Sequence, residues 1–493
     1  MTSPIAKLFG QTALYGLPSI IGRLLNYLLV PLYTAIFAEP ADYGVLSDLY
    51  AYVAFLIVLL PLGMETAYFR FIQNNDNPDR VFNNGFFSIV LLNATFFLML
   101  YITNPWIAKW MLYKEHPEYI LLIGSIVCID AIAALPLAKL RAENQAKRFM
   151  TIQLSSILLN IVLNLVFLLA FFNPSRPEEG ILFVLIANLL SSALKVILLY
   201  DIISKVQFYL DRVLIGQMFS YSWPLMIAGF AGIINETLDR VLLKQVLYNP
   251  DIPNSLEMAT AQVGIYSACY KLAMLVTIFL QAYRYAAEPF FFSQMKNIDR
   301  NVVFVRTMNI FIAIVCVAFL FVSINLGIFK FFIRKEAYYE GLKVVPILLF
   351  ANICLGIYYN QSVWYKLSNQ TKFGAYIAGV GALITIVINL LFIPMYGYMA
   401  SAWATLLAYL TQMILSFYLG QKYYPIPYDV RKFYLYIGSA IGIYCLFSLI
   451  RTSMNVQIKG LDFTLLFIGN SMIVAYLVIV YRNERALLRI NRS

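Results

Sequence analysis

Hydrophobic segments of about 20 residues recur along the whole chain, and short polar stretches separate them. Each segment is long enough to cross ~30 Å of hydrocarbon as an α-helix, which rises about 1.5 Å per residue. The pattern predicts an all-α polytopic membrane protein with about 14 transmembrane helices. Their predicted ranges are 11–37, 44–70, 82–103, 119–139, 149–172, 179–200, 220–247, 263–287, 303–329, 342–365, 374–394, 398–420, 433–450 and 461–481.

Two matching halves are visible within this pattern. Asn-Gln-Ala-Lys at 144–147 recurs as Asn-Gln-Thr-Lys at 369–372, which is 225 residues later. At the same offset and without a gap, Ile-Val-Leu-Asn-Leu-Val-Phe at 161–167 matches Ile-Val-Ile-Asn-Leu-Leu-Phe at 386–392. One matched tetrapeptide can arise by chance, but a gap-free register of 24 residues does not arise easily.

The openings of the segments repeat as well. Gly-Val-Leu-Ser at 44–47 begins the second segment, and Gly-Ile-Tyr-Ser at 264–267 begins the eighth. The first six segments therefore correspond to the next six, and both sets share one orientation because the offset is an even number of helices. We expect two six-helix lobes at 1–205 and 206–425, followed by two appended helices and a tail at 426–493. Parallel repeats of this kind support alternating access around a site between the lobes.

The composition agrees with a membrane protein, since 61% of the residues are hydrophobic and only 12% are charged. A net charge of +11 is compatible with nucleic-acid binding, but basic residues also collect in the cytoplasmic loops of membrane proteins. With the N-terminus inside, Lys and Arg number 23 in the cytoplasmic loops and 10 in the opposite loops, the latter including Lys244. This bias predicts two cytoplasmic termini and no nucleic-acid partner.

Cysteine and histidine indicate neither a disulfide framework nor a metal cluster. The five cysteines are isolated within hydrophobic segments, and the only histidine, His116, lies in a short predicted loop. We therefore expect no cofactor and no histidine-based catalysis. The N-terminus lacks the features of a cleavable signal peptide, so we expect the first hydrophobic segment to be retained.

Three basic residues lie inside hydrophobic segments: Arg23, Arg240 and Lys271. A cation at membrane depth costs at least ~2.5 kcal/mol on insertion scales, so it normally faces a bundle interior or a water-filled cavity. Several such cations in a repeated architecture predict a carrier for an anionic substrate.

Further motifs carry a resemblance to a known family. They are Pro-Leu-Tyr-Thr at 31–34 with Asp-Tyr-Gly at 42–44, Asp239-Arg240, Val-Gly-Ile-Tyr-Ser at 263–267 with Lys271, Arg-Tyr-Ala-Ala-Glu-Pro-Phe-Phe at 284–291, Trp-Tyr-Lys-Leu-Ser-Asn-Gln-Thr at 364–371, and Asn-Leu-Leu-Phe-Ile-Pro at 389–394 running into Gly397-Tyr398. These motifs follow one another in order over most of the chain. The chain resembles the polysaccharide-type flippases of O-antigen and exopolysaccharide systems, within the superfamily of multidrug, oligosaccharidyl-lipid and polysaccharide exporters.

The resemblance implies a bundle that moves a lipid-linked oligosaccharide of the undecaprenyl-pyrophosphate type across the inner membrane, for polysaccharide or lipopolysaccharide biosynthesis. The implied partners are this lipid, membrane lipids, a polysaccharide polymerase and glycosyltransferases, and coupling to a proton or Na⁺ gradient stays open. A multidrug-type exporter is the nearer alternative, although cationic drugs favour an acidic cavity. A membrane glycosyltransferase or polymerase needs acidic catalytic residues in an external loop. Because the predicted external loops are short, we expect no enzyme.

The first segment carries a polar face. Thr12, Gly16, Ser19, Arg23 and Asn26 follow one another at three- and four-residue steps, which places them on one side of a helix. A guanidinium fits phosphate oxygens well. We expect Arg23 and Asn26 to contact a pyrophosphate or an acidic sugar, and a structural ion pair between Arg23 and another helix is the alternative.

A charged group occupies the segment at 220–247. Glu236 and Arg240 lie four residues apart, and Asp239 is adjacent, so an ion pair within the helix is available. A packing network and a role in substrate binding or ion coupling both remain open. Arg240 and Lys271 are predicted at similar depth on neighbouring helices, which suggests either a shared anionic partner or neutralisation of Lys271 by a carboxylate.

A second polar stripe follows the segment at 263–287. It comprises Tyr266, Tyr270, Thr277, Gln281, Arg284 and Glu288. Aromatic and hydroxyl groups suit sugars, so we expect Tyr270, Gln281 and Arg284 in a cavity wall, although tyrosine is also the usual interfacial anchor. Asp130 lies alone midway through the segment at 119–139. It is a candidate proton or cation site, with a hydrogen-bonded packing role as the alternative.

Overall fold

Helices form the fold throughout the part of the chain that the structure describes. The computed structural model describes residues 20–490, except 74, 76, 208–209, 295–298, 369 and 459. In these residues thirteen helices are long and apolar enough to cross a membrane, and a shorter apolar helix spans Ile20–Ile36. No strand occurs among them. The predicted all-α polytopic fold with about 14 spans is confirmed.

The chain divides into two compact units. The first comprises Met1–Leu29 and Ile36–Gly264, and the second comprises Val30–Ala35 and Ile265–Ser493. The predicted lobe boundary at residue 205 rests on the sequence repeat instead of on this division, and it stays a prediction.

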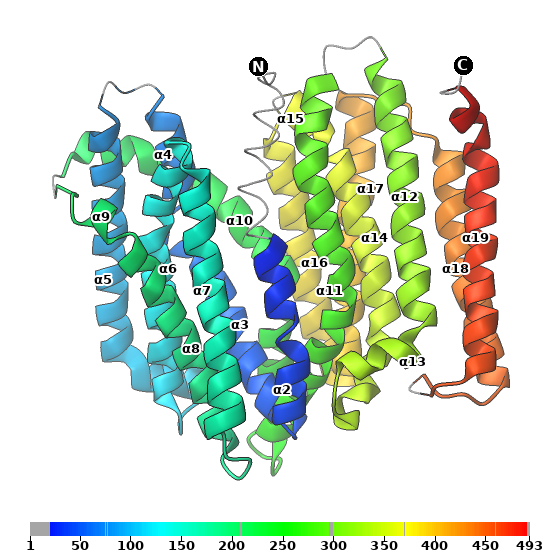
Figure 1. The fold of residues 1–493 in the computed structure, drawn as a ribbon, viewed down its shortest axis with the longest axis horizontal. Helices are drawn as coiled ribbons and strands as arrows, with labels where there is room; N and C mark the ends of the chain where they lie inside the picture. The colour runs from blue at the N-terminus through cyan, green and yellow to red at the C-terminus, as the bar shows by residue number, and fades with distance from the viewer. Residues whose placement is uncertain are drawn as a thin grey trace. The chain divides into compact units, whose positions relative to one another are not determined.

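The first unit contains the helices from α3 to α10 and the start of α11, which is longer than predicted. They are α3 (Pro40–Leu59), α4 (Met64–Phe71), α5 (Pro78–Trp110), α6 (Pro117–Ala142), α7 (Ala146–Val166), α8 (Pro177–Leu198), α10 (Arg212–Leu247) and the first residues of α11 (Ser255–Gln294), with a short turn, α9 (Tyr200–Ile203), after α8 (Figure 1). A proline opens α3, α5, α6 and α8, where its fixed φ suits a first helical turn. Helix α5 packs on α6, α8 packs on both α6 and α7, and α10 packs on α3.

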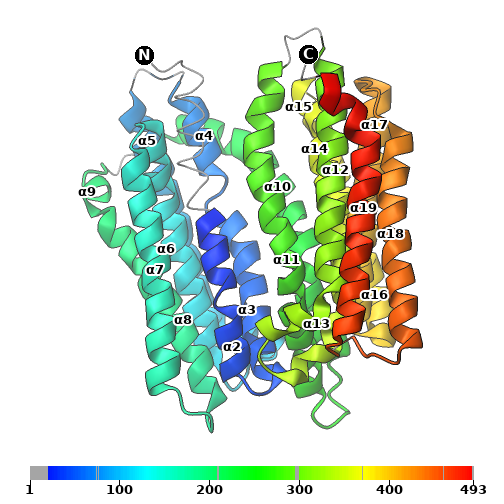
Figure 2. The same ribbon diagram turned by 45° about the vertical axis from the view of Figure 1, so that its right-hand side comes forward.

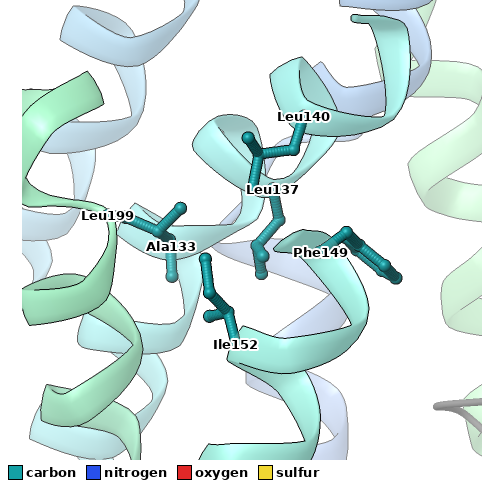
Figure 3. Close-up of a cluster of buried hydrophobic side chains, with 6 residues drawn as sticks. All are labelled: Ala133, Leu137, Leu140, Phe149, Ile152 and Leu199. Carbon is teal, nitrogen blue, oxygen red and sulfur yellow. The ribbon is translucent and has the colours of Figure 1, made fainter. Parts of the chain in front are cut away.

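A hydrophobic cluster holds α6, α7 and the end of α8 together (Figure 3). Its buried members are Ala133, Leu137, Leu140, Phe149, Ile152 and Leu199. Polar side chains supplement this packing, because Ser156 of α7 donates to the carbonyl oxygen of Ser191 in α8 at 2.7 Å. Hydrogen bonds of this kind commonly stabilise the association of helices within membranes.

The second unit contains the remaining helices. They are α2 (Val30–Ile36), most of α11, α12 (Arg300–Ile324), α13 (Leu326–Phe329), α14 (Val345–Gln361), α15 (Val363–Leu367), α16 (Lys372–Tyr396), α17 (Tyr398–Tyr423), α18 (Val430–Ser453) and α19 (Phe463–Ile490), with 3₁₀ turns at Lys330–Phe332 and Glu336–Val344. Helix α17 packs on α14 and α16. The appended helices α18 and α19 lie side by side in both views and pack on α12 (Figure 2).

The break between α16 and α17 depends on one glycine. Gly397 has φ 53° and ψ −139°, a conformation that is essentially restricted to glycine. The split that the sequence predicts between 374–394 and 398–420 is therefore present, and it has a local cause.

Equivalent positions of the sequence repeat have equivalent local structures. Asn164 donates to the carbonyl oxygen of Asn160 at 2.8 Å, and Asn389 donates to that of Thr385 at 2.7 Å. Both asparagine side chains are fully buried. Because both pairs lie 225 residues apart, the repeated motif forms the same buried hydrogen bond in each half.

Candidate functional site

Among the ion pairs that the structure describes, the most buried one joins α3 to α10. Lys244 Nζ lies 2.9 Å from Asp48 Oδ2, and the two side chains are 1% and 0% exposed. Tyr113 donates its hydroxyl to the same carboxylate oxygen at 2.7 Å. The ammonium group also donates to the carbonyl oxygen of Met111 at 2.8 Å and lies 3.4 Å from the centroid of the Tyr113 ring. We call Asp48, Tyr113 and Lys244 the buried charge cluster.

The hydrogen bonds of this cluster leave one atom unsatisfied. Tyr113 lies in the loop between α5 and α6, where burial raises the pKa of its hydroxyl well above the ordinary value and the charge of Asp48 raises it further. The hydroxyl therefore stays protonated and acts as a donor. Asp48 Oδ1 is buried without a hydrogen-bond partner among the described residues. Both donors to this carboxylate, the Tyr113 hydroxyl and the Lys244 ammonium group, meet Oδ2, so its neutralisation depends on that one side.

The sequence did not predict that the residues of the buried charge cluster lie together. The charge count places Lys244 on the external side, at the end of the predicted segment 220–247; in the structure it lies in the last turn of α10 and is almost fully buried. The available signal was that Asp48 and Lys244 both fall inside predicted hydrophobic segments. Their pairing spans 196 residues and has no signature in the local sequence.

Two glycines bring α3 and the start of α11 into backbone contact. A Cβ atom on Gly44 would lie 2.0 Å from the carbonyl oxygen of Thr260, and one on Gly264 would lie 1.8 Å from that of Pro40. Side-chain Cβ atoms essentially never approach other atoms so closely. The two helices can cross at this distance only because both positions lack side chains.

Arg240 is engaged within its own helix. Its Nη1 donates to the carbonyl oxygen of Glu236 at 2.5 Å and lies 3.3 Å from Asp239 Oδ1. The side chains of Arg240 and Asp239 are 11% and 2% exposed. The structure thus contains an intrahelical contact of the predicted kind, but the Glu236 atom that takes part is the main-chain oxygen instead of the carboxylate.

The other predicted cations lie in different surroundings. Arg23 and Asn26 are exposed on the short helix that begins at Ile20, whereas Lys271 is half-buried in α11. Thr12, Gly16 and Ser19 lie outside the described residues. Arg23 belongs to the first unit and Lys271 to the second, so a cavity that contains both stays a prediction.

The polar stripe of α11 is buried at one end and exposed at the other. Tyr266 and Tyr270 are buried, Gln281 is half-buried and Arg284 is exposed. The Arg284 guanidinium lies 5.1 Å from the centroid of the Tyr359 ring, within the range of a cation–π contact. The side chain of Glu288 lies outside the described part. The stripe thus offers its exposed polar surface near Arg284 and not near Tyr266.

Asp130 is not alone. Its Oδ1 accepts a hydrogen bond from Lys195 Nζ at 2.5 Å, and the two side chains are 20% and 16% exposed. Lys195, which the sequence places near the cytoplasmic end of the segment 179–200, belongs to α8. The pair joins α6 to α8, and sequence spacing within one helix could not reveal it. A role of Asp130 in coupling stays a prediction.

No group of three or more metal-binding side chains occurs in the portion of the chain described by the structure. The buried polar groups of this portion include ion pairs, amides and hydroxyls.

Comparison with known proteins identifies relatives over most of the chain. The profile of a family described as "Polysaccharide biosynthesis protein" matches residues 10–296. An uncharacterized membrane protein of Haemophilus influenzae is 19% identical over 294 residues, which cover 59% of this chain and 67% of the relative.

Solved structures share the fold. The lipid II flippase MurJ in an inward closed conformation superposes with a TM-score of 0.75 at 15% identity, over 96% of this chain and 99% of that one. An inward-facing multidrug resistance transporter of the MATE family gives a TM-score of 0.60 at 14% identity, over 83% and 94% of the two chains. At these identities the likeness concerns the fold alone.

Proposed function

Because the chain belongs to the polysaccharide biosynthesis protein family, we propose that it is a flippase for a lipid-linked oligosaccharide. In this proposal the substrate crosses the inner membrane by alternating access, carried on undecaprenyl pyrophosphate or a similar lipid. The observation that carries the proposal is the family match over 10–296 on a chain with the fold of a lipid II flippase. Transport of this kind needs no covalent step, and we propose no enzymatic activity.

The cations of the helices support an anionic substrate. Arg23 is exposed on its helix and Lys271 is half-buried, so each can present charge to a polar ligand. A guanidinium can bind two phosphate oxygens at once, and an ammonium group adds a point charge. We propose that both contact the pyrophosphate or an acidic sugar, with Asn26, Gln281 and Arg284 as further polar contacts.

Arg240 and the neighbouring carboxylates have a different proposed role. Since Arg240 contacts Asp239 and the main chain of Glu236, it would have to exchange these contacts for substrate. We propose that this group and Asp130 respond to the coupling ion or to the conformational state, because an ion pair can open when its surroundings become hydrated.

The proposal is tested with purified protein in liposomes. The probe is a fluorescent disaccharide on undecaprenyl pyrophosphate, and the readout is the fraction that an external quencher reaches with time. The flippase proposal predicts faster exposure of the probe than in empty liposomes. Exposure at the rate of empty liposomes, together with transport of a cationic dye, would establish the exporter alternative instead.

Variants connect the activity to the residues. Arg23→Gln and Lys271→Gln should each lower the flipping rate about tenfold, which corresponds to about 1.4 kcal/mol. Lys114→Gln is the matched control, because Lys114 is an exposed loop cation. Equal rates in both test variants and the control would refute the proposed substrate contacts.

A further inference from the structure

The two halves of the sequence repeat meet each other at equivalent residues. Gly264 follows Gly44 by 220 positions, and Thr260 follows Pro40 by the same interval. Gly44 approaches the carbonyl of Thr260, and Gly264 approaches the carbonyl of Pro40. The contact is therefore reciprocal: each half supplies the same glycine and the same carbonyl. Two copies related by a two-fold axis produce this arrangement.

The buried charge cluster extends this crossing along α3. Asp48 lies one helical turn beyond Gly44 and therefore on the same face of α3. Gly44 contacts α11, and Asp48 contacts α10. By the sequence repeat, α10 and α11 both belong to the second half. One face of α3 thus makes two separate contacts with helices of that repeat half, all inside the first compact unit and near the short loops that are predicted to be external.

The chemistry of these contacts suits repeated opening. Separation of Asp48 and Lys244 loses their attraction but restores the hydration of two charges, so the two terms largely cancel. The unpaired Asp48 Oδ1 gains hydrogen bonds from water when it becomes exposed. At the glycine crossing the atoms nearest to each glycine are main-chain atoms of the other helix, so backbones and not side chains form the closest contact. An apolar contact of the same size has no such compensation, since its exposure to water is simply unfavourable.

We propose that the Gly44–Gly264 crossing and the buried charge cluster form a reversible seal, which opens and closes during each transport cycle. The transport cycle in this proposal rests on the proposed function. Opening of the seal is a conformational change, which can be measured without any substrate. Asp48 and Lys244 are in this view gating residues and do not bind substrate.

A cysteine reporter measures opening directly. Val263 is fully buried beside Gly264, so Val263→Cys reacts with a maleimide only when the seal opens. The background carries Cys445→Ser, because Cys445 is the exposed one among the native cysteines. The labelling of this background without the reporter cysteine is subtracted. The protein is labelled after purification in detergent, so the measurement does not depend on its orientation in a membrane.

Two sets of variants should move the reporter in opposite directions. Gly44→Ala forces α3 away from the Thr260 carbonyl, so labelling should become about tenfold faster. Gly379→Ala is the matched control, because a Cβ there has no neighbour within 4 Å. Asp48→Leu with Lys244→Met keeps the seal closed without charge, so both labelling and flipping should slow about tenfold while the protein stays folded.

The outcomes separate the hypotheses. Unchanged labelling in the double variant, with normal flipping, would show a static packing contact and overturn the seal, even if Gly44→Ala failed to fold. If the variants shift labelling as expected but no variant or wild-type protein flips the disaccharide probe, the seal stands and the proposed substrate fails.

Discussion

Removal of one partner from the buried charge cluster should destabilise the protein strongly. Lys244→Met keeps the length and the apolar stem of the side chain but deletes its charge. Asp48 is then left 0% exposed, with the Tyr113 hydroxyl as the remaining donor to Oδ2 and an Oδ1 that already lacks one. The carbonyl of Met111 also loses the bond from Lys244.

The expected size follows from this burial. Breaking a buried ion pair by removal of one partner costs about 3–5 kcal/mol. Lys195→Met tests a pair that is 16% and 20% exposed, where water can reach the remaining carboxylate, so we expect a clearly smaller loss. Addition of Asp48→Leu to Lys244→Met removes the stranded charge and should recover most of the stability.

Unfolding in mixed micelles with increasing denaturing detergent measures these differences as free energies. The three variants and the wild type are compared in one lipid and detergent background. A loss below about 1 kcal/mol for Lys244→Met, or no recovery in the double variant, would contradict the assigned pairing.

Other regions give further predictions. A cysteine at Gln145 should resist an impermeant thiol reagent on intact cells while one at Asp251 reacts, and the reverse pattern would invert the predicted topology. Asp130→Asn should lower the flipping rate at normal protein level if this carboxylate couples transport to an ion; an unchanged rate across several ion gradients would leave the packing role. Gly397→Ala should lower the unfolding free energy by about 1–3 kcal/mol because φ is 53° there, and Gly442→Ala, which has open space and no such φ, should not.

The sequence predicts the architecture well because one strong physical rule governs it. Backbone groups must be satisfied within the bilayer, so each long apolar segment becomes a helix. The break at Gly397 and the equivalence of Asn164 and Asn389 follow from local motifs. The ends of the helices are harder to predict from hydropathy. Helix α10 begins at Arg212 and α11 at Ser255, several residues before the hydrophobic segments that predict them.

The charged contacts could not be predicted in the same way. Lys195 and Lys244 fall within the predicted segments 179–200 and 220–247, but hydropathy averages over a window and does not show which side chain a cation meets. Their partners are 65 and 196 residues away, and such pairs depend on which helix faces pack together. Arg240 shows the opposite case, because its contacts with Asp239 and the main chain of Glu236 lie within one helical turn, where the spacing indicates a contact.

The reciprocal form of the Gly44–Gly264 crossing has a consequence for additivity. In a symmetric dimer of six-helix subunits, one substitution would alter both sides of this contact at once. In a single chain that carries both halves, each glycine can change by itself. Yet both substitutions demand the same movement of α3 away from α11. The second alanine therefore meets a gap that the first has already opened. The free-energy cost of the double variant should be smaller than the sum of the costs of the two single variants.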